Sequence, residues 1–466
     1  MVFSSLEFIF RFLPIFLILY YIVPKVFKNG VLIIGSLGFY AWGDLKYVSL
    51  ILLSVLVNHL FVYFMNKHRG TTRSKLWLML ALFFDFGLLF FFKYINFVME
   101  NLNHITREIN GSDVFLPLQI GLPLGISFYT FQVVSFVVDS YRGNIENKPT
   151  LYRTATYILM FPKLVSGPIA SYSFMETQLI HREYSLLKFE SGLKTFVIGL
   201  GMKVIIANRI GILWNDIQTI GFESISTPLA WFGAIGYSLQ LYFDFYGYSL
   251  MAVGVGRMIG FELPENFREP YMAKSVTEFW RRWHMSLGTW FKDYIYIPLG
   301  GNRCSKGRVI CNLLVVWLFT GLWHGANWNF VLWGLYLFVL ILIEKLFIKK
   351  YLDRTKVICR LYLLFVILVS WILFAISNLN EVGIYLGRML GVVQGINVNH
   401  NDFIKFFGQY KWLFLVGIFL CFPYGKRLFE KFQNSLITTI ILLVVFWYSI
   451  YMLANGVNNP FLYFQF

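Results

Sequence analysis

The sequence predicts an all-α polytopic membrane protein with about 10–12 transmembrane helices and additional re-entrant and interfacial helices. Of its 466 residues, 58% are hydrophobic, 20% are aromatic and only 14% are charged. Apolar runs close to the ~20 residues that cross a bilayer recur along the chain, without the alternation of a β-barrel. No repeat, low-complexity tract or linker is visible, so we expect one membrane-embedded domain over residues 1–466.

The net charge of +16 comes from basic residues that gather in short loops between apolar runs. This placement is typical of cytoplasmic membrane loops and argues against nucleic-acid binding. The four cysteines, Cys304, Cys311, Cys359 and Cys421, have neither CxxC nor metal-ligand spacing, so we expect no metal site and no disulfide framework. The N-terminal apolar run contains Arg11 and lacks a clear cleavage site, which favours a retained first helix.

The first third of the chain predicts four helices and one clear basic loop. The loop Lys67–Lys75 should face the cytoplasm, which also places Lys25 and Lys28 inside and Met1 outside. The weakly charged segment Glu100–Ser112 should then be extracytoplasmic. The expected helices cover about Leu6–Val23, Gly30–Trp42, Val48–Phe64 and Leu76–Val98.

Two apolar segments contain helix-breaking residues. Leu116–Val138 carries Pro123 and Gly125 and predicts a broken or re-entrant helix, which needs protein or a water-filled cavity to satisfy its backbone. Phe161–Ile169, FPKLVSGPI, predicts a second broken element. Lys163 within it should snorkel or line a cavity, and a simple proline kink is the alternative.

A polar stripe follows in the middle of the chain. Phe196–Ala207 and Ala230–Ile259 read as helices, and Gln240, Asp244 and Tyr248 recur at steps of four in the second, which puts them on one face. The stripe could shape a polar cavity around a reactive centre or only form interhelical hydrogen bonds.

The stretch Pro264–Lys306 alternates basic and aromatic residues and predicts interfacial amphipathic helices. Arg281, Arg282 and Lys292 are candidates for holding the phosphates of an acyl donor such as a coenzyme A thioester. Attraction to anionic lipid is the alternative interpretation.

The most informative stretch is Glu278–Trp328, in which His284 and His324 each neighbour a tryptophan. His324 interrupts a long apolar segment, so it is a functional candidate, although a neutral histidine bonded to a backbone carbonyl is the alternative. The arms Asn312–Trp323 and Val331–Leu346 predict a hairpin whose first arm is too short to cross fully. His324 would therefore lie at a turn deep in the membrane.

Three further helices are expected around Leu361–Ile376, Trp412–Phe422 and Leu436–Leu453, and the loosely polar segment Asn378–Lys411 should lie outside.

In the apolar surroundings expected for His324, a neutral imidazole can act as general base toward a hydroxyl, and such surroundings favour the neutral form. The chain has no GxSxG elbow, HExxH, P-loop or dinucleotide fingerprint, and no nucleophile is evident. These observations favour direct transfer, in which histidine deprotonates a hydroxyl that attacks an activated acyl donor.

The chain resembles the membrane-bound O-acyltransferase family, in its bacterial branch of alginate O-acetyltransferases. The motifs span nearly the whole length and centre on residues 121–346. They are MVFSS at Met1–Ser5, GISFYTFQ at Gly125–Gln132, DSYRG at Asp139–Gly143, FPKLVSGPI at Phe161–Ile169, QLYFDFYGYS at Gln240–Ser249, PENF at Pro264–Phe267, EFWRRWHMSLGTWFKDYIYIPLGGNR at Glu278–Arg303 and GLWHGANW at Gly321–Trp328.

This resemblance implies that His324 is the catalytic histidine, that His284 is a second motif histidine, and that helices surround a central cavity. Trp283, Trp323 and Asn327 become candidates for lining it, beside the polar stripe and Lys163. The implied reaction moves an acetyl group from cytoplasmic acetyl-CoA, with no bound cofactor, across the bacterial inner or plasma membrane. The implied acceptor is an extracytoplasmic polysaccharide, alginate-like or peptidoglycan, reached through a partner acyltransferase.

Two alternatives remain beside acetyl transfer. Leu250 stands where a second carboxylate is expected, Tyr246 replaces a small residue, and YSLMAVG also resembles teichoic-acid D-alanylation proteins. A non-enzymatic polysaccharide or lipid transporter would predict inverted repeats, which the chain lacks.

The sequence also predicts the order of the two histidines. His284 should lie nearer the cytoplasmic face, where it positions the donor, because it follows a basic interfacial stretch. The arm from Asn312 to Trp323 spans roughly 17 Å at ~1.5 Å per residue, which favours imidazoles stacked along a passage over rings paired at one centre.

Overall fold

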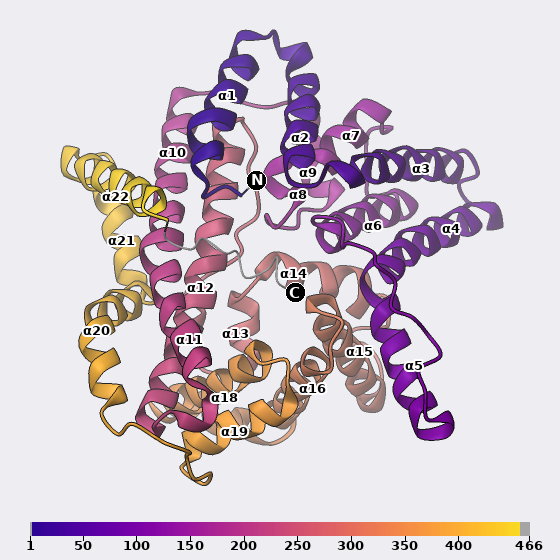
Figure 1. Cartoon of the computed structure of the whole chain (residues 1–466). Coiled ribbons are helices and arrows are strands. Elements are labelled where there is room, and N and C mark those ends of the chain that lie inside the picture. The colour runs from indigo at the N-terminus through magenta and orange to yellow at the C-terminus, as the bar shows by residue number, and fades with distance from the viewer. Residues whose placement is uncertain (1, 457–466) are drawn as a thin grey trace. The chain divides into compact units, whose positions relative to one another are not determined.

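The computed structural model describes residues 2–456, which form helices and no β-strand (Figure 1). The helices form two compact units, Met1–Leu193 with Ala252–Pro264, and Lys194–Met251 with Glu265–Phe466. The chain passes between them inside two continuous helices, α10 (Leu186–Gly201) and α12 (Thr227–Met258). This explains why the sequence shows no linker between the units.

Within the described residues, eight helical stretches are long and apolar enough to cross a membrane, and Phe8–Ile22 is a shorter apolar helix. This confirms the prediction of an all-α, multi-pass membrane protein. The eight stretches are Lys25–Lys67, Thr72–Ile109, Leu186–Ile220, Lys306–His324, Trp328–Arg354, Ile358–Ala375, Asp402–Leu420 and Leu436–Ala454.

The first unit begins with helices joined by polar side chains. Asn58 of α3 donates a hydrogen bond to Asp85 of α4 at 2.8 Å, and the His59 ring bonds Thr154 of α7 at 3.1 Å. Such bonds hold helices together where lipid removes the hydrophobic drive between them. Its first helices are α1 (Leu13–Ile22), α2 (Lys28–Asp44), α3 (Val48–Lys67), α4 (Thr72–Leu89) and α5 (Ile95–Asn110). The later helices are α6 (Ile126–Arg142), α7 (Leu151–Leu159), α8 (Phe161–Leu164) and α9 (Tyr172–Ile180).

The segment between α5 and α6 corrects the predicted broken helix. Residues 112–125 are not helical, and α6 begins only at Ile126, after Gly125 at φ 70°. A Cβ at Gly125 would lie 2.8 Å from the Leu164 carbonyl oxygen, so only glycine fits this left-handed position beside α8. Pro123 just before it cannot donate a helical hydrogen bond.

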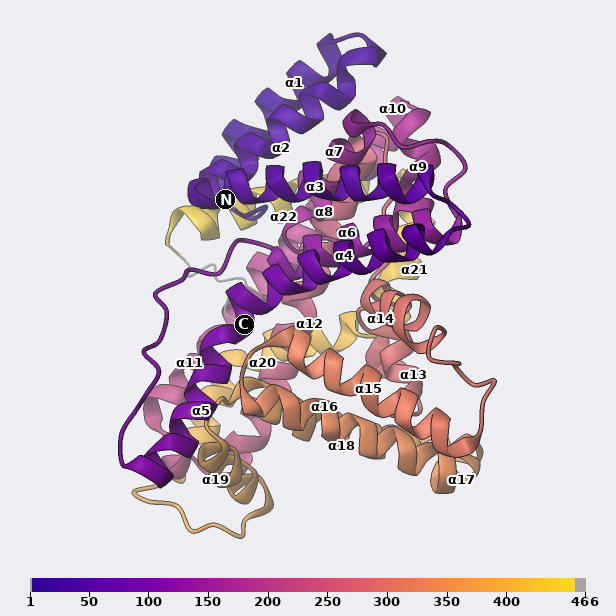
Figure 2. The ribbon, with the colours of Figure 1, turned by 90° about the vertical axis from the view of Figure 1, so that its right-hand side faces the viewer.

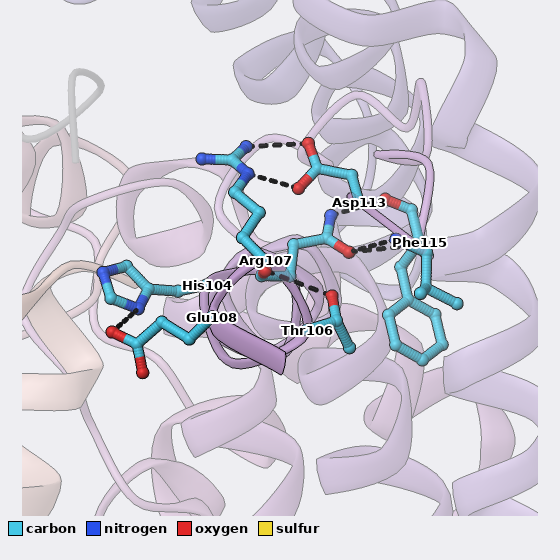
Figure 3. Close-up of polar contacts among 8 residues, drawn as sticks. His104, Thr106, Arg107, Glu108, Asp113 and Phe115 are labelled. Carbon is cyan, nitrogen blue, oxygen red and sulfur yellow. Dashed lines mark hydrogen bonds and ion pairs between the residues drawn. The ribbon is translucent and has the colours of Figure 1, made fainter. Parts of the chain in front are cut away.

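Side chains of α5 hold this extended segment in place. Asn103 accepts hydrogen bonds from the backbone N–H groups of Val114 and Phe115, and it donates one to the Phe115 carbonyl oxygen at 2.6 Å. Arg107 makes a two-pronged ion pair with Asp113, and these residues close the turn after α5 (Figure 3). Helix α5 therefore continues to Asn110, through most of the predicted extracytoplasmic segment 100–112.

The second broken element is confirmed. Helix α7 ends at Leu159, α8 is a single turn, and residues 161–170 are all buried in the first unit. Gly167 is required there, because a Cβ would lie 2.1 Å from the Pro162 carbonyl oxygen.

Two close glycine contacts bring α10 and α12 together, one in each unit. A Cβ on Gly192 would lie 2.6 Å from the Gly254 oxygen, and one on Gly199 would lie 2.5 Å from the Gly247 oxygen. Gly247 and Gly254 thus permit close helix packing.

The second unit contains the motif-rich part of the chain. Its helices after α10 and α12 are α11 (Asn208–Ile220), α13 (Val276–Arg282), α14 (Met285–Phe291), α15 (Lys306–His324), α16 (Trp328–Ile343), α17 (Lys349–Arg354), α18 (Ile358–Ala375), α19 (Leu379–Leu390), α20 (Asp402–Leu420), α21 (Pro423–Phe432) and α22 (Leu436–Ala454). Helices α15, α16 and α18 lie side by side (Figure 2). The short helices α13 and α14 fall in the stretch expected to form interfacial helices.

The segment 378–411 is more ordered than its polar composition suggested. It contains α19 and the start of α20. Arg388 is buried and donates to the carbonyl oxygens of Ile225 and Val393, and buried Asp402 accepts from Ser226. These side chains serve internal hydrogen bonds rather than solvent.

Candidate functional site

His324 lies at the turn of a tight helical hairpin. It is the last residue of α15, and α16 begins four residues later at Trp328. The arms touch through glycines, because a Cβ on Gly321 would lie 2.3 Å from the Phe330 oxygen and one on Gly334 2.4 Å from the Trp317 oxygen. The predicted turn at His324 is confirmed.

The length predicted for the first arm was wrong. Helix α15 begins at Lys306 rather than Asn312, so it has 19 residues and spans about 28 Å. This length approaches the ~30 Å thickness of a bilayer core. His324 and Lys306 therefore lie at opposite ends of a helix that is nearly long enough to cross the membrane. The basic first turn of α15 is exposed and lies before the apolar run from which the arm was predicted.

Aromatic rings enclose the His324 imidazole, which is 6% exposed. Its centroid lies 4.9 Å from that of Trp323, 5.1 Å from Trp333 of α16 and 5.1 Å from Phe374 of α18, each nearly perpendicular. Three consecutive membrane helices thus fix the position and tilt of the ring.

His284 occupies a strained position before α14. Its backbone is left-handed at φ 45°, which is rare for a residue other than glycine. Asn266 holds the turn by accepting from the N–H groups of Met285 and Ser286. Burial lowers the pKa of His284 to about 3, so the imidazole is neutral at physiological pH.

Trp323 connects the two histidines. Its ring centroid lies 5.8 Å from that of His284 and 4.9 Å from that of His324. The structure therefore brings together three residues of the predicted site. That the two imidazoles line one passage stays a prediction.

Trp283 lies in a neighbouring aromatic cluster of the same unit. It contacts Trp371 at 4.9 Å, and Trp371 contacts Phe374, which touches His324. Asn327 caps α16 by accepting from the Asn329 N–H at 3.4 Å. Both residues support the walls around the hairpin.

The polar stripe of α12 is buried, as its position in the membrane required. Gln240, Asp244 and Tyr248 are at most 7% exposed. Asp244 forms an ion pair of 2.5 Å with Lys203, which also donates to Asn208 at 2.7 Å. Lys203 was not among the predicted site residues, although a lysine inside the predicted helix Phe196–Ala207 is an available signal of a buried functional group.

The three basic donor-binding candidates lie on or just after the short helices. Arg281 is exposed, Arg282 pairs with Glu278 at 2.6 Å, and Lys292 pairs with Asp293 at 3.4 Å. Their binding of a donor stays a prediction.

Glu344 is a second buried charged residue outside the predicted site. Its carboxylate accepts from the N–H groups of Val276 and Thr277 and from the Thr277 hydroxyl, at 2.5–3.0 Å. It thereby caps α13, whose last turn leads directly into His284.

Lys163 belongs to the first unit. Its side chain is fully buried, donates to Gln132 at 2.6 Å and lies 3.5 Å from the Tyr157 ring centroid. It therefore does not snorkel to the surface. Desolvation lowers its pKa well below the ordinary lysine value.

The membrane-bound O-acyltransferase family model matches residues 36–384 of the chain. A "probable alginate O-acetylase" from Azotobacter vinelandii is 39% identical over 82% of this chain and 76% of its own length. A peptidoglycan O-acetyltransferase from Helicobacter pylori is 34% identical over 86% of this chain and 81% of its own. A teichoic acid D-alanyltransferase from Bacillus subtilis is 33% identical over 48% of this chain and 60% of its own.

Proposed function

The chain belongs to the membrane-bound O-acyltransferase family, and from this premise we propose that it transfers acetyl groups toward a polysaccharide outside the cell membrane. The donor is acetyl-CoA on the cytoplasmic side. The final acceptors are hydroxyls of an alginate-like polymer or peptidoglycan, reached through an extracytoplasmic partner acyltransferase. The names of the two O-acetylating relatives support this substrate class.

The observation that carries the proposal is the enclosure of His324 at the hairpin turn, with His284 linked to it through Trp323. In the proposed step, His324 takes the proton from an acceptor hydroxyl while the oxygen attacks the thioester carbonyl. The new C–O bond forms, the C–S bond breaks, and the thiolate leaves and takes up a proton. The aromatic walls exclude the water that would otherwise hydrolyse the thioester.

The test uses inverted membrane vesicles that contain the full chain, its partner and the polysaccharide. With labelled acetyl-CoA added outside, the wild type should transfer label to the polymer, and His324→Ala should lose at least about 100-fold of this rate. His400→Ala is the matched control, because His400 is an exposed histidine of the same unit. Wild-type rates in the His324→Ala vesicles would remove the catalytic assignment.

D-alanyl transfer is the second candidate, favoured by the match to a teichoic acid D-alanyltransferase over about half the chain. A parallel vesicle experiment supplies labelled D-alanine as a thioester on a carrier protein. Transfer from this donor and none from acetyl-CoA would replace the acetyl assignment while keeping the reaction class.

A further inference from the structure

A cavity of about 490 Å³ opens in the first unit at the end of α3, independent of the proposed reaction. One wall comes from the last turns of α3, from His59 to Lys67, and from Arg69 in the turn that follows. The opposite wall comes from residues 145–149, which connect α6 to α7. Helices α3, α4 and α6 lie side by side and hold these two loops together (Figure 2).

The mouth of this cavity carries an excess of positive charge. Lys67, Arg69 and Lys148 line it with a single carboxylate, Glu146. In the part of the chain that the structure describes, no ion pair involves these three cations. The nearby Glu176 carboxylate is already engaged, because it accepts from the N–H groups of Glu146 and Asn147.

Neutral groups shape the cavity around the cations. Asn66 donates to Ser140 at 3.2 Å and joins α3 to α6. The Lys148 ammonium lies 5.8 Å from the centroid of the Tyr63 ring, and the Arg69 guanidinium lies against Gly143. These contacts hold both loop cations toward the end of α3.

The length of α3 would bring the cavity to the level of lipid headgroups if the helix crosses a bilayer. Helix α3 has 20 residues and spans about 30 Å, the thickness of a bilayer core, which would place Lys67 at the polar boundary. His59 lies eight residues earlier, about 12 Å deeper along the helix, and Val62 and Tyr63 lie between them. The lining thus changes from cationic at the mouth to apolar and aromatic below.

We propose that this cavity binds the phosphate headgroup of an anionic phospholipid. Lys67, Arg69 and Lys148 bind the phosphate oxygens, with the bidentate fork of Arg69 suited to two of them. The glycerol end of the lipid lies against Tyr63 and Val62. A free phosphate compound offers the same oxygens but has no group for the apolar part of the cavity.

The test measures lipid retention by native mass spectrometry of the purified full chain, with phosphatidylglycerol and phosphatidylcholine as probes. The pocket variant Lys67→Gln/Arg69→Gln/Lys148→Gln should bind phosphatidylglycerol at least roughly tenfold more weakly than wild type. The matched control Lys25→Gln/Arg73→Gln/Lys75→Gln removes three exposed cations of the same unit that do not line the cavity. It should retain wild-type affinity.

Each alternative result overturns the proposal. Equal losses in both triple variants would show diffuse surface attraction only. Stabilisation by inorganic phosphate in lipid-free micelles, without a preference for phosphatidylglycerol, would assign the cavity to a soluble phosphate compound. The single variant Lys148→Gln, in an exposed loop, repeats the measurement if the triple variant does not fold, and unchanged binding there would also count against the lipid.

Discussion

Lys203 and Asp244 form a buried ion pair, with 2.5 Å between Nζ and Oδ1 and both side chains at most 3% exposed. Lys203 lies in the π-helical segment Met202–Ala207 after α10, and Asp244 lies near the middle of α12. The close backbone approach at Gly199 and Gly247 brings the two charges within reach. The negative charge of Asp244 on the polar stripe is therefore balanced by the positive charge of Lys203 inside the protein.

Removing one member of this pair should destabilise the second unit strongly. Asp244→Leu leaves the Lys203 ammonium buried without its counter-charge, and such changes cost about 3–5 kcal/mol. Lys203→Met/Asp244→Leu should recover most of the loss, because neither charge remains. Thermal unfolding of the purified protein in detergent measures both variants.

Exposed ion pairs provide the control for this measurement. Glu265→Gln breaks the contacts of this carboxylate with Arg268 and Lys426 at the surface of the same unit and should change stability by less than about 1 kcal/mol. Equal effects of Asp244→Leu and Glu265→Gln would mean that burial of the Lys203–Asp244 pair has no energetic consequence.

The hairpin that carries His324 should depend on Gly321. Gly321→Ala places a methyl group 2.3 Å from the Phe330 oxygen, so the two arms must separate, at a cost of about 1–3 kcal/mol. Gly307→Ala in the same helix meets no atom within 4 Å and should be neutral or slightly stabilising. We expect the first variant alone to lower both the melting temperature and acyl transfer. Similar behaviour of the two variants would contradict the close packing of α15 on α16.

Much of this architecture follows from the sequence because lipid imposes simple rules on it. Apolar length predicted the helices, and the two apolar arms on either side of His324 predicted a turn there. The four-residue steps of Gln240, Asp244 and Tyr248 predicted a buried face. These features depend on local composition and on the spacing of polar and apolar residues, and both can be read from a single sequence.

The remaining features depend on which helices pack together, and periodicity does not contain that information. Nothing near Asp244 in the chain identifies Lys203 as its partner, and nothing near Val276 identifies Glu344 as the cap of α13. The predicted first arm began only at Asn312, where the apolar run starts, yet α15 begins at Lys306, because exposed charged side chains in the first turn destabilise a helix little.

Stability should depend on pH through His284. Its pKa is about 3 in the folded protein and about 6.5 in an unfolded chain. Between these two pH values the unfolded state therefore binds more protons than the folded state. The stabilisation that results from the neutral His284 is complete above about pH 6.5. It is lost as the pH falls, by up to ~1.4 kcal/mol per pH unit.

The variant His284→Asn isolates this effect, because asparagine does not titrate and tolerates the left-handed backbone. Melting temperatures measured from pH 8 to 4.5 should run parallel above pH 7 and converge below pH 6, where only the wild type loses the His284 contribution. Parallel curves over the whole range would show that His284 does not stay neutral in the fold.

The last prediction places the two ends of Thr72–Ile109 on opposite sides of the membrane. This continuous helical stretch has 38 residues and spans about 57 Å, well beyond the ~30 Å bilayer core. Gly70 precedes it in the basic loop and Gly111 follows it, and a side chain at either position meets no atom within 4 Å. Both glycines are exposed and have a left-handed backbone, at φ 80° and 72°, so a cysteine at either costs about 1–2 kcal/mol of backbone strain but remains accessible.

The positive-inside rule places Gly70 in the cytoplasm and Gly111 outside. Cys304 and Cys311, the half-buried and exposed native cysteines, are first replaced by serine. In intact cells an impermeant maleimide should label Gly111→Cys and leave Gly70→Cys unlabelled, and opening the membrane should make Gly70→Cys react. Labelling of Gly70→Cys from outside would invert the topology, and labelling of both from outside would mean that α4 and α5 do not cross.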